Sequence, residues 1–105
     1  MPLKISKADF SAEVENSGLP VLADFYSDSC IPCKRLAPVL SKLETEFADR
    51  LKFVKINTNF EQELTEQFEI MAAPTLVLFK KGQEIARLRG AVKKEEIIAM
   101  LDENL

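Results

Sequence analysis

The sequence predicts one α/β domain, with a mixed five-stranded sheet at its centre and four helices around it. Short apolar runs alternate with longer segments of helical periodicity, a pattern typical of parallel strands joined by helical crossovers. Two strand-like runs near the end are separated by Lys81 and Gly82, which indicates a hairpin and therefore antiparallel strands in the same sheet. The length of 105 residues is that of one domain, so we expect a single domain over residues 1–105.

The chain begins with a strand expected at residues 3–5 and a short helix that ends near Gly18. Ser6 offers a side-chain oxygen to the first N–H groups of that helix. Phe10 and Val14 are four residues apart, so both lie on one face of the helix.

The run at residues 20–26 is almost continuously apolar. Such a run is typical of a central strand covered on both faces. Asp24 is the exception, because it places a carboxyl group where we expect little water. Burial raises the pKa of a carboxyl group toward neutrality, so Asp24 is a candidate general acid or base; the alternative is a structural acid paired with its neighbours.

The longest helix is expected after the cysteines. Its apolar positions follow helical spacing: Leu36, Val39, Leu40, Leu43 and Phe47. Pro38 lies inside this pattern, and we expect it to kink one helix rather than to divide it in two.

The second half of the chain continues the alternation. Phe60, Leu64 and Phe68 are four residues apart and predict a short helix with all three on its apolar face. The remaining strands are expected at 51–57, 75–79 and 84–89, and a closing helix at 93–105.

Composition excludes several classes of protein. With 14 basic and 17 acidic residues the net charge is −3, which argues against a nucleic-acid-binding protein, because such proteins need a basic face. No apolar run is long enough to span a membrane, and the N-terminus has no apolar segment typical of a secretory signal. We therefore expect a soluble, cytoplasmic protein.

The two cysteines, Cys30 and Cys33, are separated by two residues. A disulfide across so short a loop contributes little to stability, so the pair needs a chemical explanation. Zinc requires four ligands, and the chain has no histidine; unless two copies share a metal, redox chemistry is the better interpretation.

The position of the pair supports redox use. The cysteines lie between the predicted central strand and the long helix, and the free N–H groups and dipole of a helix N-terminus stabilise a thiolate. Pro32 fits the first helical turn, where its missing N–H costs nothing. We expect Cys30 to be the more exposed cysteine and Cys33 to be covered.

An ordered set of motifs resembles the thioredoxin family over nearly the whole chain. The matching segments are 21–25 (VLADF), 33–38 (CKRLAP), 55–57 (KIN), 73–82 (APTLVLFKKG) and 90–91 (GA). The resemblance implies the thioredoxin fold and a thiol–disulfide oxidoreductase that reduces protein disulfides through a reversible Cys30–Cys33 couple. It also implies no bound cofactor beyond this disulfide, and no metal.

The resemblance also implies roles for individual residues. Cys30 is the attacking thiolate, Cys33 resolves the mixed disulfide, and Asp24 accepts the proton of Cys33. Lys55 either tunes Asp24 or is a surface lysine whose head reaches water. Pro74 is the cis-proline that faces the disulfide.

The expected substrate-binding positions surround the dithiol. The backbone of Ala73 pairs with an extended substrate segment in the manner of an added strand, and Ala72, Gly90 and Ser29 lie beside it. The implied partners are disulfide-containing proteins and a thioredoxin reductase, with no nucleic acid and no membrane, and we expect a monomer.

The chain departs from the family pattern near the cysteines. The family usually has tryptophan where this chain has Tyr26 and Ser29, and glycine where it has Ile31. Ile31 adds stiff, β-branched bulk, whereas Ser29 offers a hydroxyl that could cap the helix. The surface before the cis-proline is 71–73 (MAA). These changes leave open the reduction potential, the reductase and the clients.

Two alternatives therefore remain at this stage. The chain is either a general reductase or a specialised reductase for a single client. A third possibility, from a different class, is a thioredoxin-fold binding module whose loop contacts a partner while the dithiol is redundant.

Overall fold

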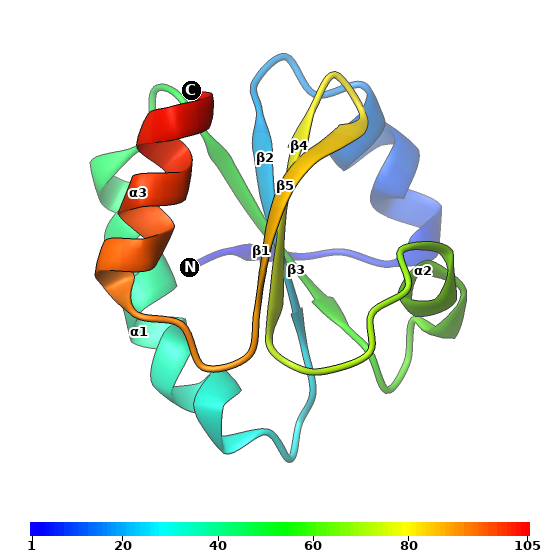
Figure 1. The fold of residues 1–105 in the computed structure, drawn as a ribbon. Helices are drawn as coiled ribbons and strands as arrows, with labels where there is room; N and C mark the ends of the chain where they lie inside the picture. Colours follow the sequence, from blue (N-terminus) through cyan, green and yellow to red (C-terminus); the bar gives the residue numbers. More distant parts are fainter.

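A computed structural model describes residues 1–105. It contains one five-stranded sheet with helical segments on both faces (Figure 1). The strands are β1 (Leu3–Lys4), β2 (Val21–Tyr26), β3 (Lys52–Asn57), β4 (Thr75–Lys80) and β5 (Gln83–Arg89). The helical segments are η1 (Lys7–Asp9), η2 (Ser11–Glu15), α1 (Ile31–Glu46), α2 (Gln62–Gln67) and α3 (Lys94–Asn104).

The sheet is mixed, as the sequence predicts. Its strand order is β1-β3-β2-β4-β5. The first three strands in this order are parallel, whereas β4 is antiparallel to both β2 and β5. The carboxyl ends of β2 and β3 therefore lie at the same edge of the sheet as the start of β4, and α1 begins at this edge (Figure 1).

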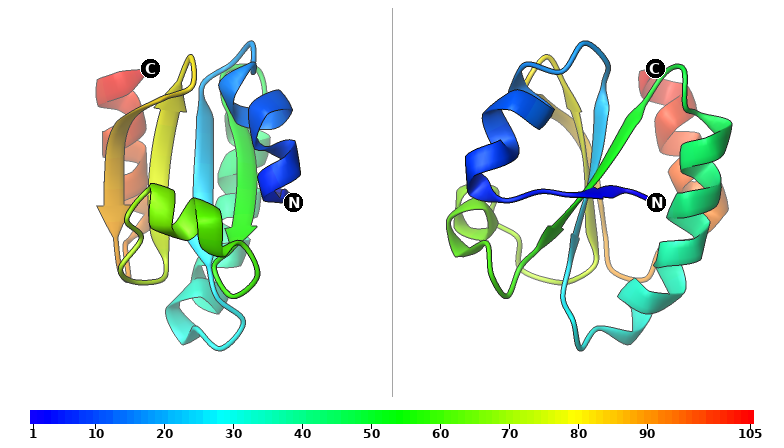
Figure 2. Two further views of the ribbon diagram at one scale, coloured as in Figure 1. Left: turned by 90° about the vertical axis from the view of Figure 1, so that its right-hand side faces the viewer. Right: turned by 180° about the vertical axis from the view of Figure 1, so that it is seen from behind.

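Two separate cores pack on the two faces of the sheet, because successive side chains of a strand point to opposite sides. One core joins α1 and α3 to the sheet and includes Leu22, Leu40 and Leu78. The other lies under the N-terminal helical segment and α2 and includes Phe25 and Phe79. Figure 2 shows the two helical layers on either side of the strands.

The N-terminal helix differs from a regular α-helix. It consists of the 3₁₀ turn η1 followed by the π-helical turn η2. The wide turn is closed by the Asn16 N–H, which donates to the Ser11 carbonyl, while the Asn16 side chain donates to Ser11 Oγ at 3.3 Å. The helix ends before Gly18, because Asn16 is already its C-cap.

Two further expectations meet different outcomes. Pro38 lies inside one continuous helix, α1, so the expectation of a single helix is confirmed. The expectation for Phe60 is wrong: α2 begins two residues after it, at Gln62, and the Phe60 ring is exposed. The other two residues expected on the apolar face of this helix do face the core: Leu64 is buried and Phe68 is half-buried.

We expect substitution of a fully buried leucine of α1 to test the core. Leu43 has no exposed surface, so Leu43→Ala should lower the free energy of unfolding by about 2–5 kcal/mol. Leu105 is partly exposed at the end of the chain, so Leu105→Ala should cost less than about 1 kcal/mol. Urea denaturation of both variants measures the difference, and equal costs would contradict the assignment of the core.

Candidate active site

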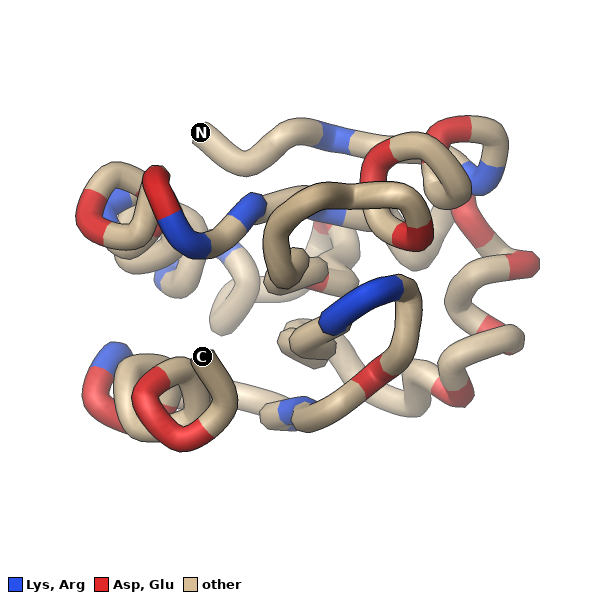
Figure 3. Tube along the Cα trace, turned by 90° about the horizontal axis from the view of Figure 1, so that it is seen from above, with Lys and Arg blue, Asp and Glu red and all other residues tan.

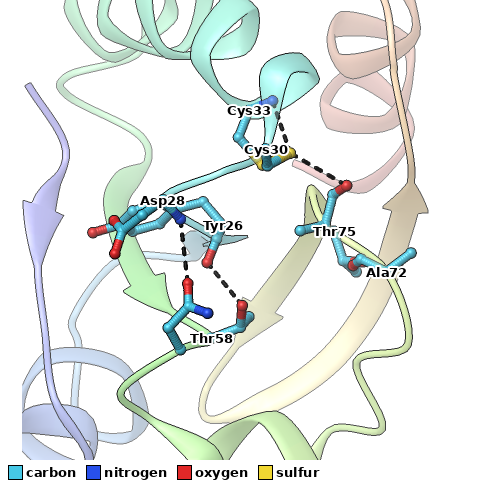
Figure 4. Close-up of a disulfide and its surroundings, with 9 residues drawn as sticks. Tyr26, Asp28, Cys30, Cys33, Thr58, Ala72 and Thr75 are labelled. Carbon is cyan, nitrogen blue, oxygen red and sulfur yellow. Dashed lines mark hydrogen bonds between the residues drawn. A yellow bond between two sulfur atoms is a disulfide. The ribbon is translucent and has the colours of Figure 1, made fainter.

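The two cysteines form a disulfide at the start of α1. Their Cα atoms are 5.2 Å apart. Cys30 is the N-cap residue, and the Cys33 backbone N–H donates to Cys30 Sγ at 3.1 Å (Figure 4). Cys33 is only 5% exposed, whereas Cys30 is half-buried, so the expected difference in their exposure is confirmed.

The helix N-terminus explains why a sulfur atom lies here. The first four N–H groups of a helix have no partner within it, and Cys30 Sγ takes the place of the oxygen that usually accepts from them. Pro32 occupies the first turn, where it removes none of the helical hydrogen bonds. In the reduced state the same donor and the helix dipole favour a thiolate on Cys30.

Ser29 does not cap the helix, although its hydroxyl made this a reasonable expectation. Cys30 is the N-cap residue instead, and Ser29 is exposed. The next residue along the loop, Ile31, is 62% exposed, so the outer surface of the disulfide loop is small and polar on one side and aliphatic on the other.

Asp24 lies in the middle of β2 and is only 6% exposed. Its Oδ1 atom has no hydrogen-bond partner in the protein. Burial raises the pKa of this carboxyl to about 7, and the positive charge of Lys55 opposes this increase. The group therefore exchanges a proton near neutral pH, as a general acid or base requires.

A small hollow joins Asp24 to Cys33 and to the surface. Its volume is about 210 Å³, and both residues line it together with Lys34 and Lys55. A larger hollow, of about 470 Å³, lies between the end of α2 and Arg89 and contains no cysteine. The volume of a hollow therefore does not identify the reactive site. The smaller hollow is the candidate because both Asp24 and Cys33 line it.

Lys55 lies beside Asp24 because the two residues are paired in the register of β2 and β3. Its side chain is half-buried, and its Nζ atom lies 5.7 Å from the centroid of the Tyr26 ring. An aromatic face attracts an ammonium group at this range. This contact holds the positive charge near the mouth of the hollow, where it acts on the Asp24 carboxyl.

The loop before β4 faces the disulfide. The Ala73–Pro74 peptide is cis, and Cys30 Sγ lies 3.4 Å from the Ala73 carbonyl oxygen. Two hydrogen bonds hold this loop: Thr75 Oγ1 donates to the Ala72 carbonyl at 2.6 Å, and the Gly90 N–H donates to the Pro74 carbonyl at 2.8 Å. Ala72, Ala73, Pro74 and Gly90 thus lie together beside the disulfide.

Gly90 adopts a φ angle of +79°, in the region that favours glycine over residues with a Cβ atom. This conformation turns the chain at the end of β5 so that the Gly90 N–H reaches the proline loop. The glycine therefore belongs to the frame of the site through its backbone.

Polar residues that the sequence analysis did not single out hold the loop before Cys30. The Asn57 side chain, which is 1% exposed, donates to an Asp28 carboxylate oxygen at 3.0 Å. The Asp28 N–H donates to Asn59 Oδ1 at 3.2 Å (Figure 4). Thr58 adds two hydrogen bonds to the Tyr26 carbonyl. The signal in the sequence was Asn-Thr-Asn at 57–59, which begins at the last residue of β3 and lies at the same edge of the sheet as the cysteines.

These features define a class of protein: a thiol–disulfide oxidoreductase with a redox-active disulfide at a helix N-terminus. No helix meets the length and apolarity needed to cross a membrane, and no three His, Cys, Asp or Glu side chains are placed to hold a metal ion. The family model described as Thioredoxin matches residues 1–103, and the chain belongs to the thioredoxin family. It is a thioredoxin-type protein disulfide reductase.

Relatives cover almost the whole chain. The thioredoxin of Haemophilus influenzae is 41% identical over 103 residues, which are 98% of this chain and 96% of the relative. The thioredoxin of Acidithiobacillus ferridurans is 40% identical over 103 residues, covering 98% and 95%. Thioredoxin 1 of Synechococcus elongatus is 38% identical over 101 residues, covering 96% and 94%.

The raised pKa of Asp24 predicts a pH dependence of stability. Unfolding restores a carboxyl pKa of about 3.9, whereas the folded value is about 7. Between these values the folded protein binds more protons, so its free energy of unfolding falls as the pH rises. Asp24→Asn should remove this decrease in the free energy of unfolding. The free energy of unfolding of the variant should therefore exceed that of the wild type by an amount that grows from pH 4 to pH 8, to at most about 4 kcal/mol.

Denaturation of the oxidised protein across this pH range measures the effect. Asp102→Asn is the matched control, because Asp102 is exposed on α3. A constant difference between Asp24→Asn and the wild type over the whole range would contradict the raised pKa.

The Asn57 network predicts a second measurable cost. Asn57→Ala removes a buried amide that donates to Asp28 and accepts from the Asn59 N–H, so it should lower the free energy of unfolding by about 1–3 kcal/mol. Gln83→Ala removes an exposed amide of β5 and serves as the control, with an expected change within about 0.5 kcal/mol. Equal stability of the two variants would show that the network does not hold the loop.

Proposed function

We propose that this protein reduces disulfides of other proteins with Cys30 as the nucleophile and Cys33 as the resolving thiol. The observation that carries this proposal is the asymmetry of the pair: Cys30 is accessible at the helix N-terminus, whereas Cys33 is buried beside Asp24. A substrate sulfur reaches the first thiol only, and the second lies within reach of the first.

The exchange takes place in two steps. The Cys30 thiolate attacks one sulfur of the substrate disulfide; a mixed disulfide forms, and the other substrate sulfur leaves as a thiolate that takes up a proton. Cys33 then loses its proton, and its thiolate attacks Cys30 Sγ. The Cys30–Cys33 disulfide forms, the mixed disulfide breaks, and the second substrate sulfur leaves. The substrate gains the two electrons that the cysteine pair loses. It also gains two protons: one comes from Cys33 by way of Asp24, and the other comes from water, which took up the Cys30 proton when its thiolate formed.

Asp24 accepts the proton of Cys33 in the second step. Three observations support this role: Asp24 and Cys33 line the same hollow, Asp24 Oδ1 has no hydrogen-bond partner, and the pKa of the carboxyl is raised to about 7. Lys55 sets how strongly Asp24 holds the proton, because its positive charge favours the carboxylate.

The substrate segment lies across the proline loop. The Ala73 backbone, next to Cys30 Sγ, pairs with an extended substrate chain by strand addition. Ala72, Gly90 and Ser29 form the small surface around this contact. Pro74 and Pro32 shape the two backbones that face each other there.

Electrons come from a thioredoxin reductase, which returns the Cys30–Cys33 disulfide to the dithiol; the protein itself holds no cofactor beyond this disulfide. We place it in the cytoplasm, where thiols are kept reduced. It acts as a monomer, as a single domain over residues 1–105.

The active-site sequence Cys-Ile-Pro-Cys is atypical of the family, and it favours a second candidate function: a specialised reductase for one client. The observation behind it is a pair of exposed apolar side chains near the disulfide, Ile31 at 62% and Met71 at 88%. Their bulk restricts which substrate surfaces reach Cys30. Coupled assays with several reductases and client proteins separate this candidate from the general reductase.

The assignment of Cys30 predicts the behaviour of single-cysteine variants. The wild type should catalyse insulin reduction by dithiothreitol, and Cys30→Ser should abolish this catalysis, because the thiol that remains, Cys33, is buried and cannot reach a substrate disulfide. Cys33→Ser keeps the nucleophile without the resolving thiol, so it should accumulate a mixed disulfide with insulin, visible by mass spectrometry. Full activity of Cys30→Ser would refute the proposed role.

A further inference from the structure

A second hollow lies beside the disulfide loop, where α1 and the segment before α3 meet, and Pro32 lines it. Its volume is about 260 Å³. Its apolar lining comes from Leu36 and Val39 of α1 and from Val92 in the segment before α3. Arg35 and Lys93 line it as well, and both side chains are exposed. We call this hollow, lined by residues 32, 35, 36, 39 and 91–93, the α1–α3 groove.

The two positive charges of the groove have no carboxylate partner. Neither Arg35 nor Lys93 takes part in a salt bridge of the structure. The neighbouring Lys94 pairs with Glu46 at 3.5 Å, and Glu96 accepts from the Lys93 backbone N–H rather than from its ammonium group. A protein of net charge −3 thus presents two free cations beside an apolar floor.

The groove is continuous with the redox site. Pro32 lies between the two cysteines and lines the groove. Ala91, on the opposite wall, directly follows Gly90, whose N–H donates to the Pro74 carbonyl. An extended chain that brings a disulfide to Cys30 therefore crosses into the groove within a short distance.

We propose that the α1–α3 groove binds an acidic segment of the protein whose disulfide is reduced, with an apolar side chain on the groove floor and carboxylates beside Arg35 and Lys93. This inference rests on the proposed function and names the chemistry of its substrates. The apolar floor supplies contact area for the bound segment. The two cations favour a segment of negative charge, because complementary charge increases specificity and the rate of association more than it tightens binding.

The expected preference is modest. Ion pairs at exposed positions contribute little each, so two of them should favour an acidic over a neutral segment by about threefold to tenfold in kcat/KM at low ionic strength. At 0.1 M salt, interactions between exposed charges more than about 10 Å apart are largely screened, so the preference for the acidic segment should decrease as salt is added.

The molecule offers matched control positions for this test. Lys42 lies farther along α1, and Lys80 lies at the end of β4 beside the turn to β5; both are exposed and take part in no salt bridge. That turn is at the end of the molecule opposite the disulfide (Figure 1). Viewed from this end, basic and acidic residues are interspersed (Figure 3).

The experiment measures reduction of disulfide-linked peptide dimers by the reduced protein. Each peptide has one cysteine and carries Asp-Leu-Asp before or after it; matched peptides carry Asn-Leu-Asn. The readout is the ratio of kcat/KM for the acidic and the neutral peptide, so a change in the intrinsic reactivity of Cys30 cancels. The proteins compared are the wild type, the double variant Arg35→Glu with Lys93→Glu, and the control Lys42→Glu with Lys80→Glu, which changes the net charge equally.

We expect the wild type and the control to favour the acidic peptide in at least one of its two arrangements. We expect the groove variant to lose this preference or to favour the neutral peptide. A ratio near one for the wild type overturns the inference, and so does an equal decrease of the ratio in both double variants. In either case, reduction of the neutral peptide still supports the proposed function. Failure to reduce any peptide, or insulin, contradicts the proposed function itself.

Discussion

The N-terminus of α1 is the constraint on which the site depends. A helix that begins at the carboxyl edge of the sheet presents N–H groups with no partner inside the helix, and here one of them donates to Cys30 Sγ. The same position leaves Cys30 accessible and places Cys33 one helical turn inward, under cover. A single backbone arrangement therefore gives two chemically identical side chains different roles. The network of Asp28, Asn57 and Asn59 matters for the same reason, because it fixes the loop that leads into this helix.

The buried carboxyl of Asp24 is costly for the fold and useful for the chemistry. Asp24 interrupts an otherwise apolar strand, and no donor satisfies its Oδ1 atom. Burial of this kind disfavours the charged form, so the fold tolerates the group most easily when it holds a proton. A thiol that must lose a proton while buried needs an acceptor of this type nearby. Lys55 of β3 is paired with Asp24 of β2, and its positive charge offsets part of the free-energy cost of the buried carboxylate.

The sequence predicted the strands, the long helix and the hairpin, because their apolar periods are strong. It also predicted the contrast between Cys30 and Cys33, since position in the first helical turn determines exposure.

Local geometry was less predictable. The π-turn of η2 depends on one hydrogen bond from Asn16, and Phe60 has helical spacing to Leu64 but lies before the helix begins. The hydrogen bond between Asn57 and Asp28 joins residues 29 positions apart, so the Asn-Thr-Asn signal at 57–59 does not reveal which residue Asn57 binds. No local pattern predicts that Arg35 and Lys93 line the same groove, because this depends on how α1 and α3 pack against each other.

The antiparallel direction of β4 determines how tolerant this architecture is to change. Ala73 reaches Cys30 across 43 residues of chain, yet its place is fixed by the pairing of Asp24 with Leu76 between adjacent strands. The segment that joins β3 to β4, including α2, therefore does not set the distance from the proline loop to the sulfur atoms. A change of length within α2 would therefore alter the surface beside the disulfide while the strand register keeps Ala73 opposite Cys30.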